Sequence, residues 1–381
     1  MKSTSRTRAA LRVLPVLLAL QVAVLLPAAP AGAATWAVVA TPNASNELNA
    51  FEGVDALTTT DAWAVGRAEH PGQPSVRPLT ARWNGSAWSI VTTPATGGRL
   101  NGVDGSAPDN VWAVGAGTTG PLAERWNGSS WSIVPTPAPP GALSASLSGV
   151  KTFSGTNAWA VGSYGTSAAP NTRTLIQRWN GTSWSIVPSP SPDPIRNLLT
   201  DVDGASANDV WAIGNAGDDG YGGGTVAGLV LHWDGSAWTQ VNVPGAVSDG
   251  TFNLPVLQDV FARSANDVWI VGRAFSWIDF RVVPIALHWN GQTWQRSVMS
   301  TAPNDGAGFH GVAALSATQV YAVGSVVARW TGTTWAAESF APGGSLSDAA
   351  AIGPSTVWGA GSRYDTGLGR FRTLAVRTTN G

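Results

Sequence analysis

Short apolar runs of about five residues, each bounded by polar turn residues, recur along most of this chain. One of them, for example VWAVG at residues 111–115, has seven versions, and their aromatic residues are Trp63, Trp112, Trp159, Trp211, Trp269, Tyr321 and Trp358. Apolar runs of this length that end in glycine are typical of β-strands. The pattern therefore predicts an all-β protein.

The seven copies follow a regular internal plan. Their aromatic residues lie 37 to 58 residues apart. Nine residues before each aromatic stands a small apolar residue, at Val54, Val103, Val150, Val202, Val260, Val312 and Ala349. Because this offset never changes, two strands and the turn between them form one rigid unit, and the variation in length lies elsewhere. Self-similarity at such a period indicates a repeat architecture.

A second phrase completes each unit. RWNGSAWSIV begins at Arg82, and close copies begin at Arg125 and Arg178. Asn-Gly favours a two-residue type I′ hairpin turn, and the proline that follows the second strand suits an outer edge. Each unit is thus predicted to contain four strands, A to D in chain order. Strand A carries the small apolar residue, strand B the VWAVG phrase, and strands C and D flank the Asn-Gly turn.

Seven four-stranded units of about 50 residues predict a seven-bladed β-propeller. Its blades should begin near residues 50, 99, 146, 197, 255, 308 and 345. The seventh unit stops after its strand C at Asn380-Gly381, and the strand D that it lacks is ATWAVVATP at residues 34–42. We therefore expect the two ends of residues 34–381 to pair in the last blade and to close the ring of a single domain.

The glycine that closes strand B, the aromatic residue before the turn, and the tryptophan and proline of strand D together resemble the kelch repeat of galactose-oxidase-like propellers. The resemblance covers essentially all of residues 34–381, but kelch units usually have two adjacent glycines where this chain has one. It implies a kelch-like secreted bacterial propeller, and the fold does not specify a function. The copper-radical oxidase chemistry of one such family uses a cysteine-linked tyrosine, which this cysteine-free chain does not have.

The first 33 residues have the pattern of an export signal. Lys2, Arg6, Arg8 and Arg12 precede an apolar run at residues 13–26, and Ala-Gly-Ala at 31–33 matches a cleavage site. The run is shorter than a bilayer span requires. We expect cleavage after Ala33, release of a secreted protein and no stable membrane insertion after signal removal; a retained signal anchor is the alternative.

Composition excludes several classes of function. Four of the 22 basic residues lie in residues 1–33, so the remaining chain has 18 basic and 23 acidic residues, and nucleic acid is not an expected partner. The absence of cysteine excludes disulfides and thiolate metal sites. Of the 20 tryptophans, 19 fall at fixed positions in strands B, C and D, which predicts packing between blades. No cofactor is expected, and the protein is expected to be a monomer.

Residues outside the repeats suggest a binding surface. Strands B and C are joined by loops of variable length, where binding sites usually occur. Trp277 lies in one such loop, and the other candidate ligand-binding residues are Phe275, Asp279, Phe280, Arg281, Tyr164, Tyr221, Tyr364 and Arg67. Aromatic rings beside Asp and Arg suit carbohydrate. We predict non-catalytic binding of an extracellular glycan or a protein partner; in the alternative, Trp277 packs over the seam between blades five and six.

Two other functions remain open. Strand A carries Asp55, Asp104 and Asp203, and two residues before each small apolar position it carries a polar ring of Glu52, Asn101, Ser148, Thr200, Gln258, His310 and Ser347. His310 with Asp201 or Asp203 could act as the acid and base of a carbohydrate-active hydrolase or lyase. The alternatives are a structural lining of the channel and a purely structural or adhesive protein. Asp218 and Asp219, in GDDGYGGG, are candidate calcium ligands without the ligand spacing of a known loop.

Overall fold

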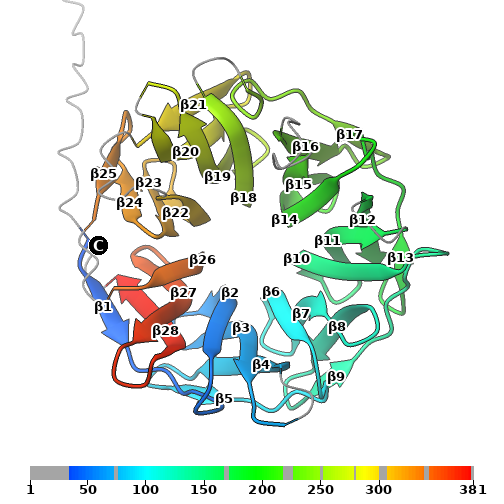
Figure 1. Ribbon diagram of the computed structural model, residues 1–381, viewed down its shortest axis with the longest axis vertical. Helices are drawn as coiled ribbons and strands as arrows, with labels where there is room; N and C mark the ends of the chain where they lie inside the picture. The colour runs from blue at the N-terminus through cyan, green and yellow to red at the C-terminus, as the bar shows by residue number, and fades with distance from the viewer. Residues whose placement is uncertain are drawn as a thin grey trace, which may run out of the picture. The chain divides into compact units, whose positions relative to one another are not determined.

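Seven small antiparallel sheets stand around a common axis (Figure 1). This arrangement comes from a computed structural model that describes residues 34–72, 76–166, 171–217, 226–248, 252–278, 280–299, 307–338 and 343–378, with the backbone alone for 252–254. Each sheet has four strands. The predicted all-β, seven-bladed propeller is confirmed.

The strands keep the same order in every blade, from the axis outward. The innermost A strands are β2 (Asn49–Thr58), β6 (Arg99–Ala107), β10 (Ser144–Ser154), β14 (Asn197–Ser206), β18 (Phe252–Ser264), β22 (Phe309–Ser316) and β26 (Ser345–Ile352). The B strands are β3 (Asp61–Glu69), β7 (Asn110–Ala116), β11 (Asn157–Gly165), β15 (Asp209–Ala216), β19 (Asp267–Ser276), β23 (Gln319–Gly324) and β27 (Thr356–Asp365).

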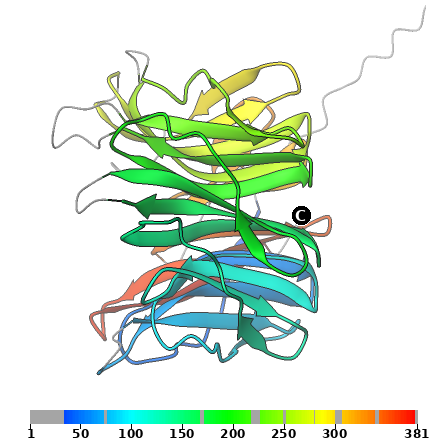
Figure 2. The same cartoon turned by 90° about the vertical axis from the view of Figure 1, so that its right-hand side faces the viewer.

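Strands C and D are the two outer strands of each blade, and strand D lies at its edge. The C strands are β4 (Val76–Trp83), β8 (Pro121–Trp126), β12 (Thr172–Trp179), β16 (Ala227–Trp233), β20 (Arg281–Trp289), β24 (Val327–Trp330) and β28 (Arg370–Thr378). The D strands are β5 (Trp88–Ile90), β9 (Trp131–Ile133), β13 (Trp184–Ile186), β17 (Trp238–Gln240), β21 (Trp294–Val298), β25 (Trp335–Ala337) and β1 (Trp36–Val39). Figure 2 shows the sheets from the side, with the connections on two opposite faces. We call the face with the B–C and D–A connections the loop face.

The first strand of the ring closes the last blade. β1 pairs with β28 in antiparallel register, with Trp36 opposite Thr378 and Val39 opposite Ala375. In Figure 1 the blue β1 lies beside the red β28. The pairing removes the open edge that β28 would otherwise present. The prediction that the two ends of the domain share one blade is confirmed.

The turns between strands C and D differ from the sequence prediction. A type I′ turn needs positive φ at both central residues, but among the described non-glycine residues only Phe280 has a positive φ. In the first blade the loop spans residues 84–87, between the paired Trp83 and Trp88. The Asn84 side chain accepts the N–H groups of Ser86 and Ala87, both at 2.9 Å, and Gly85 has a φ of 96°. The predicted two-residue turn was therefore wrong: the loop has four residues and is held by the asparagine side chain.

The glycine that closes each strand B is required by strand A. Each strand A has an irregularity in register near this glycine, as between Leu147 and Gly149 of β10. A Cβ atom on Gly162 would lie 2.0 Å from the carbonyl oxygen of Ser146. The equivalent glycines of the other six blades would meet carbonyl oxygens at 1.9 to 2.1 Å, in strand A or, for Gly324, at Gly308 directly before it. Close backbone approach therefore explains why the VWAVG phrase ends in glycine.

The repeated tryptophans pack between neighbouring blades, as predicted. Trp63 on strand B of the first blade is fully buried, and its ring lies 4.9 Å from Trp126 and 5.0 Å from Trp131 of the second blade. Trp112 and Trp159 make the same pair of contacts with the blades that follow them. The aromatic residues of the repeat are therefore structural and leave little of their ring surface for a ligand.

Candidate functional site

A polar cavity opens at the axis on the loop face. This cavity has a volume of about 490 Å³, and its lining residues are Glu52, Asn101, Ser148, Thr200, Gln258, Arg273, His310, Ser345 and Ser347. We call it the mouth. It contains all seven members of the polar ring that the sequence indicated, one from each strand A. Among the described residues that line it, Arg273, which comes from β19, is the one that lies outside strand A.

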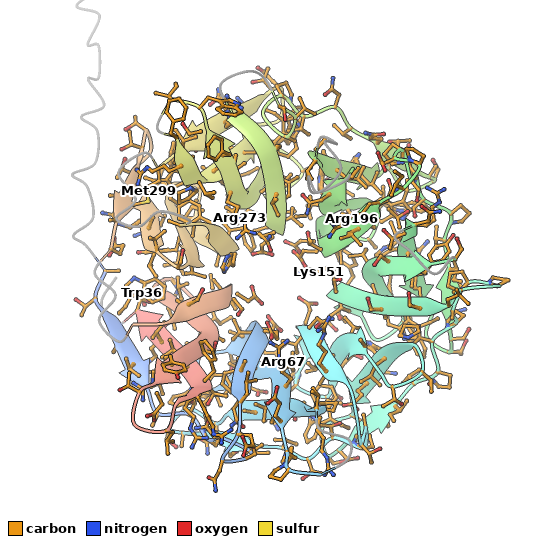
Figure 3. All side chains as sticks on the ribbon, viewed as in Figure 1. Trp36, Arg67, Lys151, Arg196, Arg273 and Met299 are labelled. Carbon is orange, nitrogen blue, oxygen red and sulfur yellow. The ribbon has the colours of Figure 1, made fainter. Side chains whose placement is uncertain are left out.

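Below the mouth the channel narrows and then widens into an acidic chamber. The narrow part has a volume of about 90 Å³ and shares lining residues with both neighbours. The chamber has a volume of about 200 Å³, and its charged lining residues are Asp55, Asp104, Lys151, Asp201, Asp203, Asp259 and Asp348. Figure 3 labels Lys151 beside the central opening. Lys151 is the only lysine of the chain besides Lys2.

Each chamber aspartate joins its own strand A to strand A of the next blade. Its carboxylate accepts a backbone N–H group across the seam between the two blades. The pairs are Gly105 N–H to Asp55 (2.9 Å), Thr152 N–H to Asp104 (2.6 Å), Val260 N–H to Asp201 (3.1 Å), Ala262 N–H to Asp203 (2.7 Å), Val312 N–H to Asp259 (2.6 Å) and Val54 N–H to Asp348 (2.8 Å). The acids therefore hold neighbouring blades together through hydrogen bonds. This agrees with the structural interpretation of the channel lining.

Lys151 and His310 complete the set of contacts at the two remaining seams. Lys151 Nζ lies 2.9 Å from Asp203 and 3.3 Å from Asp104, one in each neighbouring blade. His310 Nδ1 lies 3.2 Å from the carbonyl oxygen of Leu346 in the last blade. Every seam of the ring thus has at least one side-chain contact from a residue of strand A.

Burial makes the chamber carboxyl groups hard to ionise. It raises the pKa of Asp55 to about 8, that of Asp348 to about 7 and that of Asp104 to about 6, because a charged carboxylate is poorly solvated there. Burial and the charge of Asp201 raise the pKa of Asp259 well above its usual range, and Asp259 donates a hydrogen bond to Asp201. In part of the chamber the carboxyl groups are therefore neutral because they hold a proton, and they need no nearby positive charge.

Lys151 supplies the single positive charge of this cluster. Burial lowers the pKa of its ammonium group, but the charges of Asp104 and Asp203 outweigh that effect and hold it well above the ordinary value. Lys151 is therefore charged whenever the protein is folded at neutral pH.

The stability of the propeller is expected to fall as the pH rises from about 4 to about 8. A carboxyl group whose pKa is raised by folding contributes its full stabilisation below its unfolded pKa and loses it as the pH rises through the folded pKa. For Asp55 this range ends near pH 8. Asp55→Asn keeps an oxygen that can accept the Gly105 N–H and removes the ionisation. It should reduce the loss of unfolding free energy between pH 5 and pH 8 by about 2 kcal/mol.

Urea unfolding at pH 5, 6.5 and 8 measures this effect. Asp109→Asn, at an exposed turn position, is the matched control and should keep the pH profile of the unaltered protein. A stability that rises steadily between pH 5 and pH 8 in the unaltered protein would contradict the prediction.

The candidate catalytic residues are separated by their contacts. His310 and Asp201 line the same narrow part of the channel, but Asp201 is engaged by Asp259 and by Val260 N–H. Asp203 lies deeper, against Lys151. Burial lowers the pKa of His310, and the nearby charge of Arg273 lowers it further, which favours a neutral imidazole. No hydrogen bond joins His310 to either aspartate within the described residues.

No metal centre is found among the described residues. They contain no group of three or more His, Asp or Glu side chains that could hold a metal ion, the chamber included. Asp218 and Asp219 lie outside the described residues, as do Tyr221 and Asp279.

The described residues contain no helix that is long and apolar enough to cross a membrane.

Exposed aromatic residues gather on the β19–β20 hairpin. Trp277 is 46% exposed, Ile278 73% and Phe280 74%. The Trp277 ring lies edge-on to Phe275 at 4.9 Å and to Phe280 at 6.3 Å. Phe280 has a φ of 49°, a left-handed conformation that is strained for an aromatic residue. We call Phe275, Trp277, Ile278 and Phe280 the aromatic patch; Arg281 follows it as the first residue of β20.

The other candidate ligand-binding residues lie elsewhere. Tyr164 lines a cavity of about 370 Å³ formed by loops of the second and third blades. Tyr364 is exposed on the last blade and contacts Phe371 at 5.3 Å. Arg67 pairs with Glu52 at 3.2 Å, which places it beside the mouth, where Figure 3 labels it. Tyr164, Tyr364 and Arg67 thus belong to different blades and do not form one site.

Sequence reasoning missed Arg273. The residue directly follows Gly272, which closes strand B, and Arg67 has the same position after Gly66. Both arginines stand beside the channel in Figure 3. The repeat position after the strand B glycine was therefore a signal that could have located the mouth.

Comparisons with known proteins identify the fold only. No family model matches the chain, kelch included, and no curated protein matches it. Among solved structures, YCF48 from Cyanidioschyzon merolae has 17% identity and a TM-score of 0.56, covering 91% of this chain and 98% of that one. A streptogramin B lyase has 10% identity and a TM-score of 0.59, covering 90% and 97%.

A third similar structure is a protein of unknown function from Dyadobacter fermentans, with 10% identity, a TM-score of 0.52 and coverage of 90% and 97%. The chain is thus similar over nearly its whole length to propellers of the YCF48 and streptogramin B lyase type. At such low identity this similarity shows a shared fold and does not transfer an activity. The expected kelch relationship is supported only as far as the propeller itself.

Proposed function

We propose that this chain is an exported, monomeric and non-catalytic binding protein that binds an extracellular glycan through its loop face. The observation that carries the proposal is the aromatic patch. Three large apolar side chains on one short hairpin are between 46% and 74% exposed, although the other tryptophans of the chain serve packing between blades. Exposed aromatic groups on a rigid scaffold are typical of binding surfaces.

The geometry of the patch favours a sugar ring. The Trp277 ring contacts Phe275 and Phe280 of its own hairpin, edge-on in both cases. Its exposed surface can stack against the C–H face of a sugar, while polar side chains of the mouth take up hydroxyl groups. These contacts within one hairpin also support the patch as a preformed surface rather than as a cover for the seam between blades five and six.

The contacts of the chamber support a non-catalytic role. A hydrolase or lyase at the mouth would need Asp201 or Asp203 as a free acid or base. Both carboxylates accept N–H groups from the next blade, and Asp203 also faces Lys151. Catalysis would therefore break contacts that hold blades together.

Trp277→Ala is expected to weaken binding to a polysaccharide by about tenfold, because it removes the stacking ring. The measurement is a pull-down of the protein, from residue 34 onward, on a panel of soluble polysaccharides and cell-wall preparations, followed by titration of the best ligand. Ile133→Ala, an exposed apolar residue on the outer strand β9, is the matched control and should bind normally.

Either of two results would overturn this proposal. One is binding that survives Trp277→Ala unchanged, which would move the site away from the patch. The other is no binding to any polysaccharide, which would leave a protein partner or a structural role. Turnover of a bound polysaccharide that disappears in both Asp203→Asn and His310→Gln would instead establish the catalytic alternative.

A further inference from the structure

Arg273 is a positive charge without a countercharge in the mouth. Its side chain is exposed and lines the cavity of about 490 Å³. Among the described residues it makes no ion pair and no hydrogen bond through its guanidinium group, in contrast to Arg67, which pairs with Glu52 at 3.2 Å. Within the described lining of the mouth, the single carboxylate, that of Glu52, is thus already neutralised, and Arg273 remains available to an anion.

The position of Arg273 is set by its neighbours. A Cβ atom on Gly308 would lie 3.3 Å from both Cβ and Cδ of Arg273, so the arginine stem lies close against the backbone of the sixth blade. Its neighbours along β19, Gly272 and Ala274, are buried. The backbone there pairs regularly with β20, with Arg273 opposite Pro284. The guanidinium group is therefore carried by a rigid strand and not by a loop.

The remaining lining of the mouth offers hydrogen bonds to hydroxyl groups. Within the described part of the chain, Ser148, Gln258 and Ser347 make no side-chain hydrogen bond to another protein group. Because a carbonyl oxygen only accepts, the contact between His310 Nδ1 and Leu346 O places the proton on Nδ1 and leaves Nε2 as an acceptor. Hydroxyl, amide and imidazole groups that can each accept a hydrogen bond match the hydroxyl groups of a sugar.

The mouth and the aromatic patch belong to the same strand. Side chains alternate along a strand, so Arg273 and Phe275 project from one side of β19, whereas Ala274 and Ser276 between and after them are buried. Phe275 in turn contacts Trp277 at 4.9 Å. The guanidinium group in the mouth and the aromatic pair therefore follow one another along β19 and its hairpin.

We infer that the mouth binds the carboxylate of an acidic saccharide, with Arg273 as its cation and with the neighbouring sugar ring against Phe275 and Trp277. This inference rests on the proposed glycan-binding function and specifies its ligand class. Arginine holds a carboxylate through two parallel hydrogen bonds, which gives orientation as well as affinity. The serine, glutamine and histidine side chains then select a hydroxylated ligand over a bare carboxylate.

The test compares a trimer of galacturonic acid with its methyl ester, which has the same sugar rings and no charge. Calorimetric titration of the unaltered protein should show at least tenfold tighter binding of the acid. Arg273→Gln should weaken binding of the acid by about 10- to 100-fold and leave the ester within about twofold. Arg273→Lys should recover only part of the loss, because an ammonium group cannot form the two parallel bonds.

Arg77→Gln is the matched control. Arg77 is an exposed arginine at the start of β4, and its replacement changes the net charge equally without touching the mouth. It should bind the acid normally. Equal losses of affinity in Arg77→Gln and Arg273→Gln would show that the preference for the acid over the ester arises from the net charge of the protein. That result would overturn the inference.

The other outcomes separate the inference from the function on which it rests. Equal binding of acid and ester, both lost in Trp277→Ala, would overturn the carboxylate site and retain glycan binding. Tighter binding of a glutamate-rich peptide than of the acidic trimer would overturn the saccharide class. Binding of neither trimer, together with binding of neutral polysaccharides from the panel, would also overturn the inference alone, whereas no binding of any saccharide would overturn both.

Discussion

Deletion of residues 34–42 is expected to cost the propeller at least about 3–5 kcal/mol, a large part of the stability of an ordinary domain. β1 provides the fourth strand of the last blade, and four of its residues pair with β28. Trp36 is buried and packs edge-on against Tyr321 of the sixth blade at 5.9 Å. Truncating a buried tryptophan alone accounts for the stated loss, and the exposed edge of β28 adds a tendency to aggregate.

Urea and thermal unfolding of proteins that begin at residue 34 and at residue 43 measure this loss. A peptide of residues 34–42 added to the shorter protein should restore part of its stability, because it can occupy the vacant edge. Val38→Ala, at an exposed position of β1, is the control and should stay within about 0.5 kcal/mol of the unaltered protein. A shorter protein that unfolds at the same urea concentration as the longer one would show that β1 does not close the ring.

Lys151→Met is expected to destabilise the protein by about 3–5 kcal/mol at pH 8. Lys151 bridges Asp104 and Asp203 across two seams, and the side chains of these two acids are only 15% and 10% exposed. Removal of one partner leaves buried carboxylates without a countercharge, which is the costly way to break a buried ion pair. At pH 5 the loss should be smaller, because the pKa of Asp104, already raised to about 6 by burial, lets a proton take the place of the lysine.

Unfolding of the Lys151→Met protein at pH 5 and pH 8 checks both parts of this prediction. Arg67→Met is the control, since the side chains of Arg67 and its partner Glu52 are 33% and 28% exposed and their ion pair should contribute about 1 kcal/mol or less. Adding Asp203→Asn to Lys151→Met should recover part of the loss at pH 8. A Lys151→Met protein within about 1 kcal/mol of the unaltered one at pH 8 would show that the chamber charges are solvated.

Some features could be predicted because they recur in every unit. The constant offset between Val150 and Trp159, repeated in the other blades, placed strands A and B. The missing outer strand of the last blade was matched to residues 34–42 by its resemblance to the other D strands. Such predictions need only local patterns and the requirement that a repeated sheet closes its edges.

Other features required the assembled ring. Asp259 and Asp348 were not singled out, because their repeat position holds glycine in four other blades. The sequence also does not show that six acids from five blades line one chamber. The order of residues likewise could not tell that Glu52 is neutralised by Arg67 while Arg273 is left unpaired. The four-residue C–D turn was missed because Asn-Gly also occurs in a loop held by the asparagine side chain.

By itself, therefore, the sequence determined that this protein is a seven-bladed propeller closed by its two ends, because periodic strand patterns and packing residues act locally and are repeated. The tertiary structure alone decided which charged groups meet at the axis, which of them are neutralised by protons or by Lys151, and where an unpaired arginine stands next to exposed aromatic rings. Those properties depend on distances between blades that are some 50 residues apart in the chain, and electrostatic energy depends on such distances and on burial rather than on sequence order.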